Sequence, residues 1–519
     1  MTAPPISPPN RRPRRFVVTA LVVTALALSG CSAGGTSTGG PAGTPSDTLR
    51  YAAPSAGGAA TNDPHGLLAG ESDIVRMALT YDVLTVPGPD GSPEPRLATE
   101  WTPDDTLTRW TVSLRGDAAF SDGRPVTAAD ALFSLRRMGE KAAENFGRLA
   151  MFDLAASSAP DPTTLLLVTT TPYAEVGTAL MGATFVVPDA TTDFGAGLVP
   201  GSGPFRPTGG DAQTTVFERN DGWWGPPPPS RVIEVRAIAD PAARAQAVQS
   251  GEVDLAGSVP AVAVAPAEAA GFTVARKPGA TMYPVVMRTD TAPFDDPRVR
   301  EAVKLATDRR QLLDTVFLGQ GELGNDLITP TDPSSPQNLP QRTPDLEGAR
   351  ALMTEAGLAG GVDVTLHTTT AYPGMDTAAT LLAQQLAPIG IRAAVQVGPP
   401  DTYFVDVYGT EPFYVSFLGG IPFLDVVRVA LTPGSPTNET AWADPAWNAD
   451  LASALADPDA ATRAGRLGDL QTTLRDEGGY LVWGVGDRVD LAAPGVSGVS
   501  PAIGFGAGFV DQVTPPSPS

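Results

Sequence analysis

The fold is decided by three nearby stretches of sequence: residues 95–101 (PRLATEW), 110–115 (WTVSLR) and 120–130 (FSDGRPVTAAD). In the second stretch apolar and polar residues alternate, which predicts a half-buried strand. Near its start the third stretch holds Ser121, Asp122 and Gly123, residues typical of a turn. It ends with Thr127 and, three positions later, Asp130, which predicts a capping box at the start of a helix. Strand, turn and helix therefore follow one another here.

The same alternation returns along the chain. Residues 231–238 predict a strand, and Asp240-Pro241 predicts the start of a helix that ends at Gly251. Asp296-Pro297 predicts one long helix that reaches Val316, and Thr343-Pro344 predicts another. The final unit has predicted strands at 362–366 and 391–397 on either side of a predicted helix at 376–387. A strand-helix-strand unit predicts an α/β fold with parallel strands.

The three opening stretches resemble the signature region of the extracellular solute-binding proteins of oligopeptide, dipeptide and nickel importers, the family 5 type. Further pieces of that resemblance follow in the family's order: 201–205 (GSGPF), 223–224 (WW), 249–254 (QSGEVD), 293–300 (PFDDPRVR), 306–309 (ATDR), 356–357 (AG) and 389–391 (IGI). The resemblance spans roughly residues 50 to 500. Most of these residues read as structural, and Trp223 and Trp224, beside a Gly/Pro turn, are expected to be packing anchors.

The resemblance implies an α/β, periplasmic-binding-protein-like fold with two closing lobes and an additional inserted domain. Lobe I would take residues 49–85, 190–282 and 488–512, the inserted domain II residues 86–189, and lobe III residues 283–487. The implied function is capture of an extracellular peptide or related small solute, by hinge closure, and its delivery to the permease of an ABC importer. We expect a monomer.

The N-terminus predicts an export signal and a lipid anchor. A basic start that holds Arg11 and Arg15 precedes the apolar run 16–28, which is too short to cross a bilayer comfortably. Residues 28–31 (LSGC) look like a bacterial lipobox, so Cys31 is the expected lipidation site. Residues 1–30 would be the signal peptide and 31–48 a flexible tether. The protein would thus sit outside the cell, anchored to the outer face of the membrane.

Composition excludes several other functions. A formal net charge of −22 disfavours binding to nucleic acid. One cysteine and two histidines supply neither a disulfide framework nor a Cys/His zinc cluster. We expect no cofactor and no resident metal.

Candidate ligand contacts come from the resemblance. Peptide-binding members carry an aspartate in an aromatic-rich segment of lobe III, and the equivalent here is the stretch 413–425, where glycine and apolar residues take the acidic place. Asp425 is either a shifted equivalent or a cap for the next helix. Phe417, in the same stretch, and Trp483 are further candidates.

Two further residues are candidates for ligand binding, one for a carboxylate and one for a nickel complex. Arg288 follows the apolar run 282–287 and either binds a ligand carboxylate or pairs with Asp290 or Asp295. The histidines are His65 and His367, of which His367, at a strand end, is the candidate for a nickel complex.

The main alternative to a solute-binding protein is an enzyme. Residues 504–508 (GFGAG) are glycine-rich but lack the dinucleotide fingerprint and the phosphate-loop lysine, and the sequence holds no Gly-x-Ser-x-Gly elbow. We therefore predict no enzymatic activity. The alternative functions are a secreted hydrolase and a sensory lipoprotein on the same fold.

Overall fold

The structure is a computed structural model that describes residues 47–55, 61–68, 70–88, 91–141, 147–181, 184–211, 213–400, 402–432, 438–500 and 510–516. The predicted signal peptide, Cys31 and the glycine-rich residues 504–508 lie outside the described residues. None of the helices within the described ranges is long and apolar enough to span a membrane.

The sheet of lobe I is formed by strands from widely separated parts of the chain. It has nine strands in the order β18-β12-β20-β11-β1-β10-β9-β8, with β14 joined to β20. Their bounds are β1 Thr48–Pro54, β8 Phe205–Gly210, β9 Thr214–Arg219, β10 Val232–Ile238, β11 Leu255–Ala256, β12 Thr273–Met282, β14 Gly321–Leu323, β18 Leu418–Gly419 and β20 Gly484–Ala492. The predicted strand 231–238 is β10, which runs parallel to β1. Strands β14 and β18 belong to this sheet although they lie within residues 283–487, the range predicted for lobe III.

Helices cover both faces of this sheet. Because successive side chains of β1 point to opposite faces, Leu49 and Tyr51 pack with α1 while Ala52 packs with α4 and α5. Their bounds are α1 Glu71–Thr80, α4 Pro241–Gln249 and α5 Val264–Ala269, with the 3-10 turn η1 Ala261–Ala263 before α5. Asp240 caps α4 and Pro241 takes its first turn, as predicted.

The inserted domain has its own sheet, in the order β4-β5-β7-β6. Its elements are β4 Ala98–Pro103, β5 Arg109–Leu114, β6 Ser158–Asp161, β7 Thr164–Val168, α2 Ala128–Glu140 and α3 Val176–Ala179, and the strands β2 Thr85–Pro87 and β3 Pro93–Pro95 form a separate ribbon. Trp110, Val112 and Leu114 point into the domain core. Thr127 and Asp130 form the predicted capping box of α2.

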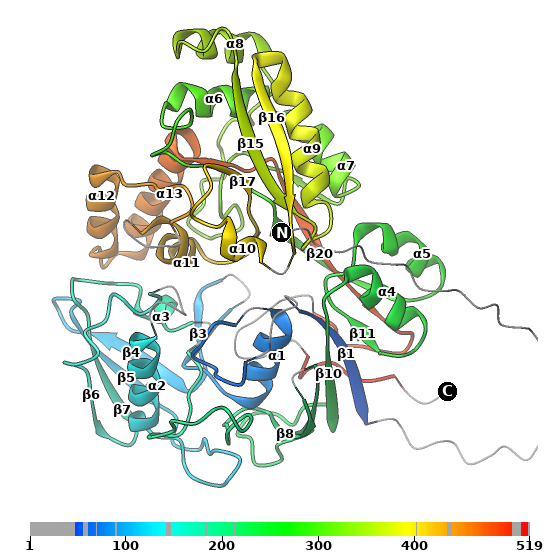
Figure 1. Ribbon diagram of the computed structural model, residues 1–519. Helices are drawn as coiled ribbons and strands as arrows, with labels where there is room; N and C mark the ends of the chain where they lie inside the picture. The colour runs from blue at the N-terminus through cyan, green and yellow to red at the C-terminus, as the bar shows by residue number, and fades with distance from the viewer. Residues whose placement is uncertain are drawn as a thin grey trace, which may run out of the picture. The chain divides into compact units, whose positions relative to one another are not determined.

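Lobe III is built on a sheet of five strands in the order β16-β15-β17-β13-β19. The strands are β13 Val285–Met287, β15 Val362–Thr369, β16 Ile391–Gly398, β17 Phe413–Val415 and β19 Tyr480–Leu481. The helices are α6 Pro297–Ala306, α7 Arg309–Val316, α8 Leu346–Glu355, α9 Met375–Leu386, α10 Tyr403–Asp406, α11 Phe423–Val426, α12 Pro445–Leu455 and α13 Ala460–Glu477, with the short turns η2 Ala387–Ile389 and η3 Val427–Leu431. Strands β15 and β16 are parallel and α9 connects them, as predicted (Figure 1).

The predicted long helix from Pro297 to Val316 is wrong, because the structure divides it into α6 and α7. Thr307 is extended, with φ −83° and ψ 117°, and the side chain of Asp308 accepts a hydrogen bond from the amide of Gln311 at 3.0 Å. Asp308 thus caps a new helix, which the apolar spacing alone did not indicate. Similarly, α8 begins at Leu346 with Asp345 as its cap, two residues after the predicted Pro344.

Candidate functional site

The chain passes directly between the sheets of lobes I and III at three places. The links are β12 to β13 through Tyr283-Pro284, β17 to β18 through Ser416-Phe417, and β19 to β20 through Val482-Trp483. They run side by side, because β12 pairs with β18 and β20 while β13 pairs with β17 and β19. We call these three links the hinge. Short paired links allow the lobes to rotate about them while both sheets stay intact.

Aromatic side chains fill the lobe III side of the hinge. Tyr372 stacks on Phe417 with ring centroids 4.0 Å apart and planes 6° from parallel. Trp483 stacks on Phe317 at 5.1 Å. Trp483 is buried while Phe417 is partly exposed, so of these two predicted ligand contacts Phe417 is the one a solute can reach. Stacked, partly exposed rings offer a rigid apolar surface to a ligand.

Tyr372 was not recognised from the sequence. It lies in the loop between β15 and α9, and its ring is held between Phe404 and Phe417. Burial and the negative charge of Glu71 raise the pKa of Tyr372 to about 12, an effect that the positive charge of Arg244 opposes. Glu71 and Arg244 both belong to lobe I. Tyr372 therefore lies near enough to lobe I for these two charges to act on it.

On the lobe I side, Glu71 is held by a buried charged network. Arg488 on β20 donates to its two carboxylate oxygens at 2.6 and 2.8 Å, and Tyr51 also donates to it. Arg488 Nε donates to Asp490 at 3.0 Å, and Asp490 accepts the Ser258 amide at 2.8 Å. Burial raises the pKa of Asp490. Because the hinge strand β20 carries Arg488 and Asp490, this network fixes that strand to the first turn of α1.

The inserted domain is tied to lobe I by the tryptophan pair. The indole N–H of Trp224 donates to Asp82 at 2.8 Å, and Arg96 donates to the other oxygen of Asp82 at 2.6 Å. The Arg115 guanidinium lies 3.3 Å from the centre of the Trp224 ring. Trp223 is buried and contacts Trp224. Both tryptophans are thus the packing anchors that the sequence predicted.

Arg288 is engaged within the protein. Its guanidinium donates to both carboxylate oxygens of Asp290, at 3.0 and 2.7 Å, and to the carbonyl oxygen of Gly409. Of the two interpretations drawn from the sequence, this geometry favours the structural pair with Asp290.

Asp425 does not cap a helix, which corrects one of its two predicted roles. It lies inside α11, whose N-cap is Pro422, and its carboxylate forms an ion pair with Arg428. Arg428 in turn donates to the hydroxyl of Tyr173 in the inserted domain at 3.3 Å. Asp425 therefore orients a side chain that crosses between the two halves of the protein.

The two histidines lie apart and are each engaged by protein groups. His65 is buried, its Nε2 lies 2.7 Å from the Phe185 carbonyl oxygen, and burial lowers its pKa to about 4. His367 Nε2 lies 3.3 Å from Glu411. Within the described residues no group of three His, Cys, Asp or Glu side chains is arranged to hold a metal ion.

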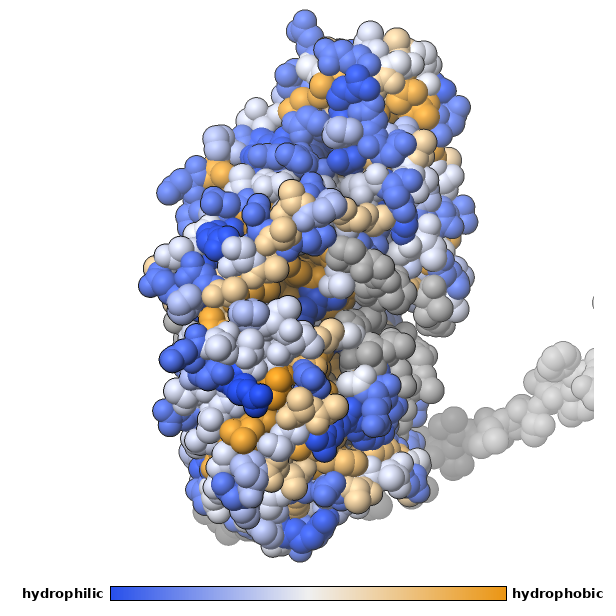
Figure 2. All heavy atoms as spheres, turned by 90° about the vertical axis from the view of Figure 1, so that its left-hand side faces the viewer, coloured by the Kyte–Doolittle hydropathy of each residue, from blue (hydrophilic) through white to orange (hydrophobic). Residues whose placement is uncertain are grey.

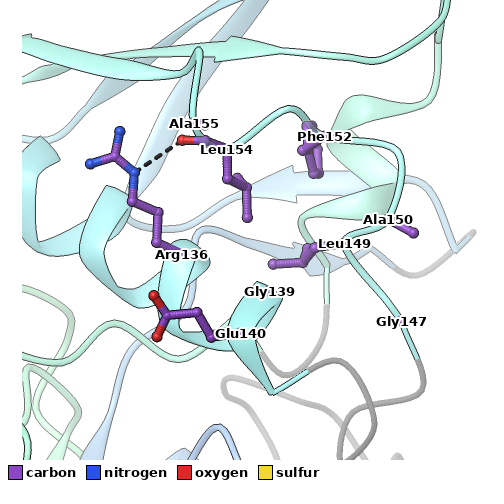
Figure 3. A pocket seen from close by; sticks show the side chains of 9 residues that line it. All are labelled: Arg136, Gly139, Glu140, Gly147, Leu149, Ala150, Phe152, Leu154 and Ala155. Carbon is purple, nitrogen blue, oxygen red and sulfur yellow. Dashed lines mark hydrogen bonds between the residues drawn. The ribbon is translucent and has the colours of Figure 1, made fainter.

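A hollow in the inserted domain lies apart from the hinge (Figure 3). It is lined by residues of α2 and of the segment 147–155. Arg136, at its edge, donates to the carbonyl oxygens of Leu154 at 3.0 Å and Ser157 at 2.9 Å, and the dashed line in Figure 3 marks the bond to Leu154. The Arg136 guanidinium is thus used in hydrogen bonds within the inserted domain.

Two lobes, each built on its own sheet and joined by three adjacent links, have the architecture of a solute-binding protein. The chain belongs to the bacterial extracellular solute-binding proteins, family 5, whose middle region it matches over residues 92–426.

Known relatives include the nickel-binding periplasmic protein of Escherichia coli K12, 28% identical over 322 residues, and the glutathione-binding protein GsiB of Shigella boydii, 28% identical over 308 residues. Each alignment spans 58% of this chain and 60% of the relative. The match thus covers less than two thirds of either relative.

Solved structures match over more of the chain. DppA of Helicobacter pylori, in complex with the peptide STSA, has a TM-score of 0.76 at 21% identity, covering 90% of this chain and 96% of that one. NikZ of Campylobacter jejuni, in complex with Ni(L-His), has a TM-score of 0.78 at 17% identity, covering 90% and 98%. At this identity they show the fold: a periplasmic-binding-protein architecture.

Proposed function

We propose that this protein is the lipid-anchored solute-binding component of an ABC importer, and that it captures a peptide or a closely related small solute. The observation that carries the proposal is the junction at the hinge. The stacked pair Tyr372 and Phe417 lies beside the hinge on lobe III, close enough to lobe I for the charge of Glu71 to act on Tyr372, so a solute bound there would contact both lobes and favour the closed form.

A peptide is favoured over a nickel complex by the engagement of the histidines. His65 is buried against Phe185, and His367 is paired with Glu411. Aromatic surface suits side chains of a peptide, whereas a nickel complex is commonly held through histidine. The comparisons include both classes, glutathione- and peptide-binding proteins as well as nickel-binding ones, so the choice rests on the histidines and the aromatic surface.

Native mass spectrometry of the purified full-length chain tests the solute class. A peptide carried through purification adds its own mass to the protein, and fragmentation of the released species gives its sequence. As added probes, glutathione, the dipeptide Met-Leu and a nickel–histidine complex separate the alternatives. Binding of the nickel complex alone would overturn the proposal, and turnover of a bound peptide would replace transport by hydrolysis.

Anchoring has its own test in Cys31, which is the single cysteine of the chain. Replacement of Cys31 by Ala should abolish lipidation, because no other thiol can accept the diacylglycerol. The variant should move from the membrane fraction to the soluble extracytoplasmic fraction. Unchanged partitioning into detergent would contradict the anchor.

A further inference from the structure

The inserted domain and lobe III touch through a short segment that the solute site does not use. Figure 2 views this side of the described structure and shows apolar residues along the line where the two halves meet. The contacting segment is Tyr173-Ala174-Glu175, between β7 and α3. Each of its three residues bonds to a different element of lobe III.

The bonds are specific and directional. Tyr173 accepts a hydrogen bond from Arg428 of η3 at 3.3 Å, and the amide of Ala174 donates to the carbonyl oxygen of Leu455 at the end of α12 at 2.7 Å. Arg463 of α13 donates to Glu175 at 2.5 Å.

The side chains that form these contacts are largely buried, and further hydrogen bonds within each domain hold them in place. Only 11% of the Arg463 side chain and 20% of the Glu175 side chain are exposed. Thr178 donates to the second oxygen of Glu175 at 2.6 Å, and Arg463 also donates to the Asp457 carbonyl oxygen at 2.7 Å. Leu455 packs against the core of the inserted domain as well as its own. Partly buried, hydrogen-bonded ion pairs are stronger than exposed ones.

The hinge makes these contacts conditional on closure. The network of Asp82, Arg96 and Trp224 fixes the inserted domain to lobe I, so the two move together. Rotation of lobe III about the hinge then separates Tyr173-Ala174-Glu175 from its partners. We therefore expect these contacts only in the closed form.

We propose that Tyr173-Ala174-Glu175 is a latch that holds the closed conformation through groups outside the solute site. It adds stability to the closed form whichever solute is bound. Under the proposed function, its consequence is a slower release of the solute, because release requires opening. Its existence as a latch does not depend on the identity of that solute.

Hydrogen–deuterium exchange of the full chain without any added solute tests the latch directly. The Ala174 amide is protected by Leu455 only while the latch is closed, so peptides that cover residues 170–180 report its opening. Glu175→Gln and Arg463→Gln should each raise exchange there by roughly ten-fold, the range expected for a coupling between sites. The double variant should exchange no faster than either single variant.

Arg466→Gln is the matched control. Arg466 lies on the same helix, α13, but bonds Ser453 within lobe III, so its loss should leave residues 170–180 protected. Arg463→Lys keeps the charge and should give an intermediate rate, and thermal unfolding verifies that each variant is folded. Three results would overturn the latch: unchanged exchange in both single variants, additive effects in the double variant, or an equal increase in Arg466→Gln.

Discussion

Glu439 is a buried acid in the core of lobe III, surrounded by hydroxyl groups. The hydroxyl of Tyr414 lies 3.5 Å from its carboxylate, and the hydroxyls of Tyr408 and Ser416 are near enough to lower its pKa. The Tyr480 hydroxyl lies nearby and has no hydrogen-bond partner within the described part of the chain. Burial raises the pKa of Glu439 to about 7, an effect that the hydroxyls oppose. The fold therefore prefers the protonated acid.

This preference predicts a pH dependence of stability. The folded state holds a proton on Glu439 up to about pH 7, whereas the unfolded chain loses it near the ordinary value of 4.5, so stability should fall as pH rises through this window. The loss is on the order of 3 kcal/mol at 1.36 kcal/mol per pKa unit. Urea unfolding at pH 5 and pH 8 measures it.

Glu439→Gln removes the titrating group and keeps a similar shape, so its stability should change less between pH 5 and pH 8 than that of the unmodified protein. Glu100→Gln, at an exposed position on β4, is the control and should behave like the unmodified protein. An equal fall with pH in Glu439→Gln would show that Glu439 is not the group responsible.

Arg288 carries a second prediction about a single side chain. Since Asp290 and the Gly409 carbonyl oxygen occupy its guanidinium, Arg288→Ala should destabilise the fold by about 1–2 kcal/mol. It should leave the preference between the dipeptide Met-Leu and its C-terminal amide unchanged. Calorimetric titration of both compounds checks this, and a selective loss of affinity for the free acid would instead assign Arg288 to the solute.

At the start of α2, both residues of the capping box, Thr127 and Asp130, were predicted from the sequence. The amide of Asp130 donates to the Thr127 hydroxyl oxygen at 3.4 Å, and the Thr127 amide donates back to Asp130 at 2.8 Å. Thr127→Ala should therefore cost about 1 kcal/mol of unfolding free energy in chemical denaturation. Thr127→Ser, which keeps the hydroxyl, should cost much less. Equal losses in both variants would mean that the methyl group, not the cap, matters.

Elements were predictable where their signals are local, whereas of the stacked pair at the hinge only Phe417 was predicted, from the resemblance, and Tyr372 was not. Strand β5 and the caps of α2 and α4 depend on residues within a few positions of one another. The break between α6 and α7 has a local signal too, Asp308, but the continuous apolar spacing obscured it. Tyr372 and Phe417 lie 45 positions apart, and only the pairing of β15 with β17 brings their segments together. No pattern in the sequence marks such a contact.

At the level of the whole protein, the proposed hinge and latch predict that solute binding, stability and compactness rise together. A solute that binds only the folded closed form, present at 100 times its Kd, should add about 2.7 kcal/mol to the unfolding free energy. Because closure brings lobe III onto lobe I and the inserted domain, the same solute should lower the radius of gyration. Both follow from one equilibrium, so they should have the same midpoint in a titration.

The full-length Cys31→Ala variant suits this experiment, since an unlipidated chain needs no detergent in X-ray scattering. Each probe that raises the melting temperature, among glutathione, Met-Leu and the nickel–histidine complex, is titrated while scattering is recorded. In the additional Arg463→Gln background the solute-free protein should be more open, so the decrease in radius on binding should be larger and the affinity lower. A probe that raises the melting temperature with an unchanged radius in both backgrounds would show that binding does not close this hinge.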